Sequence, residues 1–220
     1  MTLPPQLLPA VIVVVIMLLV GLPVHEFSHA LAAYRLGDGT AKLFGRLTLN
    51  PIAHFDPVGG TLLALTFIGS GGSLGFGWAK PTPVNPLNLE GGRRGEALVA
   101  AAGPLSNLVL AIAGAIPLRF VIANPQLAGP NDILFNVLSL FVLINLLLMI
   151  FNFIPIPPLD GSKVLFAFLD RRTEYQIRPI LEQYGFFILF ALLFLPPGNS
   201  IGLRIITPIL HALFTFLVGI

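Results

Sequence analysis

The chain has 220 residues, of which 55% are hydrophobic and only 10% charged, and its mean hydropathy is +0.90. A soluble domain carries about 25% charged residues, so this composition excludes a water-covered globule, and it equally excludes a disordered chain. The 12 basic and 10 acidic residues leave a net charge of +2 without a basic run, and cysteine is absent. These features exclude a nucleic-acid surface and a disulfide-stapled module. The composition predicts an integral membrane protein.

The first predicted element is a retained membrane helix. Residues 7–22 are almost wholly apolar, and no Lys or Arg precedes them, whereas a secretory signal begins with a basic region. The apolar stretch continues to Arg35, which gives it about the length of a full span. Its polar residues therefore lie inside the hydrophobic stretch.

Five further apolar segments follow, at 58–70, 96–122, 131–153, 180–196 and 201–219. The segment 58–70 is short for a span, and Gly and Pro residues crowd both of its flanks. The neighbouring stretches 41–49 and 76–84 have the punctuation and partial alternation that are typical of short strands.

Basic residues indicate how these segments cross the membrane, because cytoplasmic loops carry an excess of Lys and Arg. One group of basic residues follows the first helix, and a second group follows the segment 58–70. The two groups lie on the same side of the membrane only if 58–70 re-enters the membrane without crossing it. Non-helical backbone at membrane depth needs protein or a water-filled cavity beside it. We therefore expect an all-α polytopic protein of about five to six transmembrane segments, with a hydrated pocket, its N-terminus outside and its C-terminus inside.

Three ionisable residues lie inside the first hydrophobic stretch, in the run His25-Glu26-Phe27-Ser28-His29. Positions i and i+4 of a helix share one face, so both imidazoles can bind one metal ion, with Glu26 as general base. Zinc suits such a set, because it takes imidazole and carboxylate ligands and leaves a position for water. The alternative is a chance pattern in a helix with satisfied polar residues. An ionisable group inside a span costs about 2.5–3.5 kcal/mol on insertion scales, which favours a functional site.

A catalytic zinc site usually has a third protein ligand, and Asp160 is the strongest candidate. The other acidic residues lie in Gly- or Pro-rich loops, at helix ends or among arginines. Asp160 ends a run with three prolines directly after an apolar span, and these prolines hold the backbone extended. The alternative is that Asp160 caps the helix that begins near Gly161.

Two other polar residues have competing interpretations. His54 either lines the water path or binds substrate, or it stabilises the Asn50-Pro51 turn by a hydrogen bond. Asn107 belongs to a stripe of small residues at nearly helical spacing, which favours close helix packing with Asn107 as a polar latch. The stripe consists of Ala100, Gly103, Asn107, Ala111 and Gly114.

Three motifs taken together resemble the site-2 proteases, the intramembrane zinc metalloproteases of peptidase family M50. They are His25-Glu26-x-x-His29, then Gly103-Pro104-Leu105-Ser106-Asn107, and then the complete Asn-x-x-Pro-x-Pro-x-Leu-Asp-Gly pattern at 152–161. The third motif is much more specific than the first. Two further runs, 49–57 and 77–81, look like the compact branch of the family, which lacks a PDZ or CBS domain.

This resemblance implies a three-helix catalytic core with a membrane-embedded, re-entrant β-hairpin that presents an edge strand to substrate. It divides the single membrane domain 1–220 into a core 7–170, a re-entrant region 38–92, a Gly-Pro-x-x-Asn helix 96–122, a Leu-Asp-Gly segment 131–170 and a C-terminal helical hairpin 180–219.

Residue by residue, the resemblance implies that His25, His29 and Asp160 bind one Zn²⁺ ion and that Glu26 activates water. Asn152 falls on the family's Asn, which holds the substrate backbone or the developing oxyanion. The implied activity is endopeptidase cleavage of a single-span membrane protein within the lipid bilayer, near the cytoplasmic face of a prokaryotic cytoplasmic membrane.

Two other classes of function compete with this one. A small transporter or channel also has broken helices and intramembrane charge, but it predicts inverted repeats, and none is visible in the sequence. A non-catalytic scaffold with the same fold would be expected to lose Glu26 or a metal ligand, and all of these residues are present.

Overall fold

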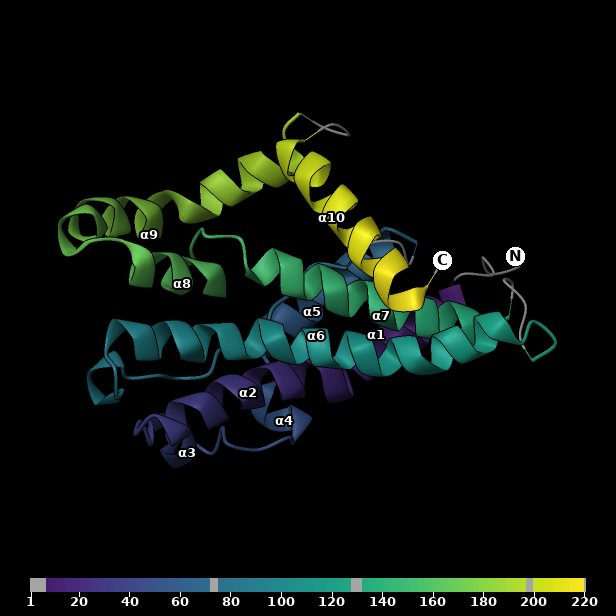
Figure 1. Cartoon of the computed structure of the whole chain (residues 1–220), viewed down its shortest axis with the longest axis horizontal. Helices are drawn as coiled ribbons and strands as arrows, with labels where there is room; N and C mark the ends of the chain where they lie inside the picture. The colour runs from purple at the N-terminus through teal and green to yellow at the C-terminus, as the bar shows by residue number, and fades with distance from the viewer. Residues whose placement is uncertain (1–6, 72–74, 128–131, 197–199, 220) are drawn as a thin grey trace.

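The computed structural model, described at residues 7–71, 75–127, 132–196 and 200–219, consists of long helices that run side by side (Figure 1). The longest are α6 (Arg93–Ala123), α9 (Arg171–Phe194), α7 (Ile133–Asn152) and α10 (Ile201–Val218). Helices α1 (Leu7–Ile16) and α2 (Leu22–Arg35) join through one π-helical turn, Met17–Gly21. The shorter helices are α3 (Thr40–Leu43), α4 (Pro51–His54), α5 (Pro57–Gly69) and α8 (Asp160–Phe168).

Five of the described helical segments are long and apolar enough to cross a membrane, and they confirm the predicted number of spans. They are Leu7–Arg35, Arg93–Ala123, Ile133–Asn152, Arg171–Phe194 and Ile201–Val218. Helix α5 is apolar but only 13 residues long, or about 20 Å at the usual rise per residue. It is too short for a comfortable span.

Helix α6 is the centre of the molecule, because α2, α7 and α8 all pack against it. All members of the predicted small-residue stripe on this helix are buried, so the packing prediction is confirmed. Farther along α6, Leu118 is buried together with Val142 and Leu146 of α7 and Val218 of α10. This apolar cluster lies in the half of the bundle toward the end of α6.

Two stretches predicted as short strands, 41–49 and 76–84, are not strands, and the described part of the chain contains no β-strand. In the first stretch, the Asp38 carboxylate accepts hydrogen bonds from N and Oγ1 of Thr40, so the chain turns into helix α3. The second stretch has no regular secondary structure, and its two prolines lack the N–H groups that a ladder requires. The strand assignments, and with them the β-hairpin, are therefore wrong for these residues.

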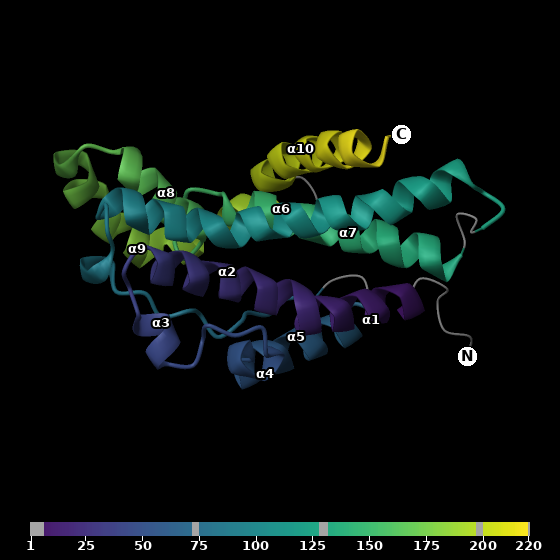
Figure 2. The same cartoon turned by 60° about the horizontal axis from the view of Figure 1, so that its bottom comes forward.

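The region between α2 and α6 covers one side of the bundle. Figure 2 shows α3 and α4 on the side of α2 that faces away from α6 and α7. Asp38 holds this region together, because its carboxylate also accepts hydrogen bonds from the Asn85 amide N–H and the Asn88 side chain. Burial alone would raise the pKa of Asp38, but these hydrogen bonds hold it below its usual range.

Helices α9 and α10 form an open V on the other side of the bundle (Figure 1). They meet near their junction, where Gly202 packs against the Leu192 carbonyl. Helix α10 then crosses α7 obliquely and reaches the end of α6, where the Arg119 guanidinium donates to the Phe216 carbonyl. The described end of α10 thus lies at the end of the bundle where α1 begins. The charge pattern predicts the N-terminus outside and the C-terminus inside, and this orientation stays a prediction.

Candidate metal centre

Three side chains converge between α2, α6 and α8. His25 and His29 lie one turn apart on α2, and Asp160 is the first residue of α8. The Asp160 Oδ2 atom is 3.4 Å from His25 Nε2 and 3.2 Å from His29 Nε2, and the two Nε2 atoms are 3.1 Å apart. Within the described residues, this is the group of His and acidic side chains whose ligand atoms can hold a metal ion.

The outer nitrogens of both imidazoles are held by hydrogen-bond acceptors. The Nδ1 atom of His29 is 2.7 Å from the Val99 carbonyl oxygen, and the Nδ1 atom of His25 is 2.7 Å from Asn107 Oδ1. A carbonyl oxygen can only accept, so Nδ1 carries the proton and Nε2 of the neutral ring has a free lone pair.

The chemistry of this donor set fits a zinc ion. Two imidazole lone pairs and a carboxylate oxygen face one another within hydrogen-bond distance, an arrangement that is repulsive unless a cation lies between them. Zinc usually has three such protein ligands in catalytic sites, and its histidine ligands usually donate their second N–H to a carbonyl or carboxylate. His25, His29 and Asp160 would hold the ion.

Gly103 allows α6 to come this close to the two histidines. A Cβ atom at this position would lie 2.2 Å from His29 Nε2 and 2.7 Å from His25 Cε1, distances at which atoms overlap. Gly103 is one of the buried positions of the small-residue stripe. Its lack of a side chain therefore makes room for the ligand atoms themselves.

The segment before α8 aims Asp160 at the histidines. Gly161 packs directly on the Phe153 carbonyl, where a Cβ would lie 2.4 Å away, and the chain turns sharply between 153 and 159. Helix α8 begins without a side-chain cap, so the alternative role of Asp160 as a helix cap is wrong.

Glu26 is buried at 8% exposure and lies against the non-helical segment before α6. Its Oε2 atom accepts hydrogen bonds from the Thr82 amide N–H at 2.9 Å and from Thr82 Oγ1 at 2.8 Å. The Thr82 hydroxyl is also 3.1 Å from the Glu26 carbonyl oxygen. These contacts hold one carboxylate oxygen in place and leave the other for chemistry.

Asn152 and His54 are not part of this cluster. Asn152 ends α7, and its amide donates to the Leu148 carbonyl at 3.0 Å. His54 is fully buried, with Nε2 2.8 Å from the Thr48 carbonyl oxygen. This bond favours the interpretation of His54 as a residue that stabilises the local turn, while the role of Asn152 stays a prediction.

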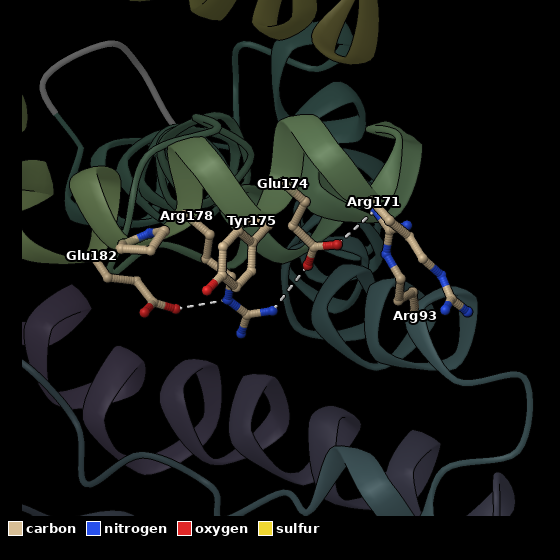
Figure 3. A pocket seen from close by; sticks show the side chains of 7 residues that line it. Arg93, Arg171, Glu174, Tyr175, Arg178 and Glu182 are labelled. Atoms are coloured by element: carbon tan, nitrogen blue, oxygen red, sulfur yellow. Dashed lines mark hydrogen bonds and ion pairs between the residues drawn. The ribbon is translucent and has the colours of Figure 1, made fainter.

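Charged residues of α9 form a separate network at the end of the bundle where α6 begins. Figure 3 shows Arg178 between Glu174 and Glu182, its partners at 3.2 and 2.8 Å. Glu174 is also 2.9 Å from Arg93 of α6. The guanidinium of Arg93 donates to the carbonyls of Phe166 and Leu169, which end α8. This network joins α9 to the metal-bearing core.

Comparison with known proteins identifies the family of this chain. The sequence profile of the family described as "Peptidase family M50" matches residues 13–127 and 119–196. The chain belongs to peptidase family M50. It is therefore a zinc metalloprotease of the site-2 protease type, and its apolar helices make it a multi-pass membrane protein.

Individual relatives agree with this assignment. A Bacillus subtilis (strain 168) protein named "Putative zinc metalloprotease YwhC" is 39% identical over 200 residues, which cover 90% of this chain and 85% of the relative. Proteins named "Putative zinc metalloprotease Rip2" from Mycolicibacterium smegmatis and Mycobacterium tuberculosis (strain H37Rv) are 31% and 32% identical. These matches cover 82% and 83% of this chain and 66% of each Rip2 protein. No solved structure gave a significant match.

Sequence reasoning missed two residues of the site, Thr82 and Asn145. Thr82 lies 56 residues from the glutamate that it contacts, and nothing in its local sequence marks it. Asn145 bonds Asn107 and lies in the middle of the apolar helix α7. A polar residue within an apolar span was the available signal for Asn145.

Proposed function

We propose that the protein is an intramembrane endopeptidase, which hydrolyses a peptide bond within or near the transmembrane helix of a single-span membrane protein. The observation that carries this proposal is the position of the metal ligands along a helix long enough to span. His25 lies ten residues before Arg35, the end of the segment Leu7–Arg35, so the site is about 15 Å from that end. A hydrocarbon core is about 30 Å thick, so His25 would lie near its middle and His29, about 9 Å from the same end, would lie inside it.

The residues of the chain have separate tasks in this reaction. A zinc ion held by His25, His29 and Asp160 supplies Lewis-acid polarisation of water and of the scissile carbonyl. Glu26 takes a proton from the attacking water through its free oxygen and passes it to the leaving amine. Asn152 has a second amide N–H, which we assign to the carbonyl oxygen of the substrate as negative charge develops there.

The substrate must unwind before it can react, because a helix hides its carbonyls in i to i−4 hydrogen bonds. The non-helical segment 75–85 is the candidate partner for the unwound chain, since it already lies against Glu26 through Thr82. Its backbone carbonyls can pair with the N–H groups of an extended chain, whereas Pro81 and Pro83 have no N–H of their own to donate. We further propose that the region 38–92, which includes both this segment and the short helix α5, re-enters the membrane.

The orientation follows from the basic residues at one end of the bundle. Arg35, Arg93, Arg94, Arg171 and Arg172 lie at helix ends or starts near that end. The positive-inside rule places such an end in the cytoplasm. We propose that the metal centre is reached from this side of a prokaryotic cytoplasmic membrane.

Cleavage of a defined substrate by Glu26→Gln and wild-type protein tests the proposal. The full chain, loaded with zinc in detergent, would be incubated with a single-span test protein, and products would be counted by gel and mass spectrometry. We expect product from the wild type alone, while both proteins bind one zinc ion, since Gln keeps the shape of Glu without its basicity. Equal cleavage by both proteins, or two zinc-loaded proteins that leave a panel of single-span substrates uncut, would contradict the proposal.

A further inference from the structure

Two asparagines that are fully buried connect the metal centre to α7. Asn107 of α6 and Asn145 of α7 both have 0% exposure. Asn107 Oδ1 is 2.7 Å from His25 Nδ1, and Asn107 Nδ2 is 3.1 Å from Asn145 Oδ1. Asn145 Nδ2 in turn is 2.9 Å from the Phe141 carbonyl oxygen and 3.4 Å from Met17 Sδ.

The partners at the far end of this chain determine the direction of every hydrogen bond in it. The Phe141 carbonyl only accepts, so Asn145 must turn its NH₂ group toward it and its oxygen toward Asn107. Asn107 must then present its own NH₂ to that oxygen, which turns its carbonyl toward His25. His25 consequently donates from Nδ1, and its Nε2 lone pair faces His29 and Asp160. Reversal of either amide would bring two oxygens or two N–H groups together.

We infer that Asn145 and Asn107 are positioning residues that together select the metal-binding tautomer of His25. The backbone carbonyl of Phe141 sets the polarity, and the two amides transmit it across α7 and α6 to the imidazole. Helix α7 thereby takes part in metal binding although it contributes no ligand to the cluster. A partner that holds the second N–H of a histidine ligand typically raises metal affinity or activity by about 10- to 100-fold.

Simple packing does not account for this pair of amides. Both side chains lie among apolar residues of α6 and α7, and burial of an amide without its hydrogen bonds costs about 1–3 kcal/mol in proteins. Leucine at both positions would fill a similar space without that cost. The specific contribution of the amides is a directed chain of hydrogen bonds that ends on a metal ligand. This inference concerns the zinc site alone and does not depend on where the substrate is cut.

The zinc dissociation constant of purified full-length variants tests the inference, measured by competition with a chromophoric chelator. Asn107→Leu removes the acceptor of His25, and Asn145→Leu removes the group that orients Asn107. Asn107→Asp keeps an acceptor for the His25 N–H, but it loses the donor to Asn145 and adds a carboxylate that faces Asn145 Oδ1. The matched control is Leu146→Ala, because Leu146 is fully buried next to Asn145 in the same helix interface. The unfolding temperature of each zinc-free variant would be measured in parallel.

We expect Asn107→Leu to weaken zinc binding by about 10- to 100-fold and Asn145→Leu to weaken it by less. Asn107→Asp should bind zinc at least as tightly as the wild type despite a lower unfolding temperature. Leu146→Ala should lose stability with unchanged zinc affinity.

Two results would overturn the inference. The first is that Asn107→Leu and Asn145→Leu both bind zinc as tightly as Leu146→Ala does. The second is that Asn107→Asp weakens zinc binding as much as Asn107→Leu does. If Asn107→Leu does not fold, Asn145→Leu compared with Leu146→Ala decides the same question.

Discussion

Helices α2 and α9 are attached to the central helix α6 in contrasting ways. Between α2 and α6 the contacts are buried hydrogen bonds of 2.7 Å to the two histidines, made possible by Gly103. Between α9 and α6 they are ion pairs whose side chains are partly exposed, such as Arg178 at 35%. A buried hydrogen bond fixes the relative position of its donor and acceptor, whereas an exposed ion pair is weakened by water and salt.

This difference indicates where the positions of side chains must be held accurately. Metal ligands must be held within a fraction of an ångström, and the interface of α2 and α6 provides that through close packing and directed hydrogen bonds. The attachment of α9 tolerates variation, because each of its ion pairs contributes about 0–1 kcal/mol.

The largest effect is expected at the closest contact between α2 and α6. Gly103→Ala places a methyl group within 2.2 Å of His29 Nε2, so the helices must separate and the ligand atoms must move. We expect loss of stoichiometric zinc binding and a loss of activity of more than about 100-fold, because a displacement of about 1 Å can cost that much. Zinc content by mass spectrometry and cleavage rate measure the two effects.

Gly202→Ala is the control at another close helix contact. Its added methyl would meet the Leu192 carbonyl oxygen at 2.9 Å, where α9 and α10 join. This variant should lose stability and keep its zinc. Wild-type zinc binding by Gly103→Ala would show that the close approach at the metal centre is not required.

A smaller effect is expected from the hydrogen bonds that hold Glu26. Thr82→Val removes the hydroxyl, and a hydrogen bond to a charged group contributes about 1.5–3 kcal/mol. We expect kcat to fall by about 10- to 100-fold with unchanged KM and zinc content, because Glu26 loses the hydroxyl bond and is held by the Thr82 amide N–H alone. Thr82→Ser keeps the hydroxyl and should restore the rate. A fall in kcat that Thr82→Ser shares equally would assign the effect to packing.

Asp38 extends the contrast to the region between α2 and α6. The folded-state pKa of Asp38 is below its ordinary value of 3.8, so the carboxylate stabilises the fold above that pH. This contribution is lost as the pH falls through the folded-state value. Asp38→Asn should therefore unfold at a lower temperature than the wild type at pH 7, and the difference should shrink toward pH 3. A difference that stays constant with pH would contradict this account.

The smallest effect is expected where α9 is attached. Arg178→Met removes the contacts with Glu96, Glu174 and Glu182 but keeps a long side chain. We expect a loss of about 1 kcal/mol in stability or less and unchanged zinc affinity. High salt should lower the unfolding temperature of the wild type more than that of the variant. A large loss of zinc binding here would show that α9 contributes to the metal centre.

The sequence predicted those parts of the molecule that depend on local patterns. Apolar runs of about 20 residues predict spans because the bilayer sets their length, and five such helices are present. The i, i+4 spacing of His25 and His29 predicts that they share one face of a helix. The prolines before Asp160 predict a backbone held extended, with Asp160 as the third metal ligand. The structure brings all three together.

The rest depends on contacts that no local pattern encodes. The prediction of a strand at 41–49 was wrong, because hydrogen bonds from Thr40 to the Asp38 carboxylate turn the chain into α3. Asn145 and Thr82 act through partners 38 and 56 residues away. Such contacts follow from how the helices pack, and their identity emerges only in three dimensions.

The position of the cut in a membrane-embedded substrate tests the central claim most directly. A single-span protein would be incorporated with zinc-loaded wild-type enzyme into phospholipid nanodiscs, and the product ends would be sequenced by mass spectrometry. A site near the middle of the spanning segments predicts a Glu26-dependent cut inside the hydrophobic segment, about 15 Å from its end by helical rise. Glu26-dependent cuts confined to the water-exposed flanks of the substrate would contradict the claim.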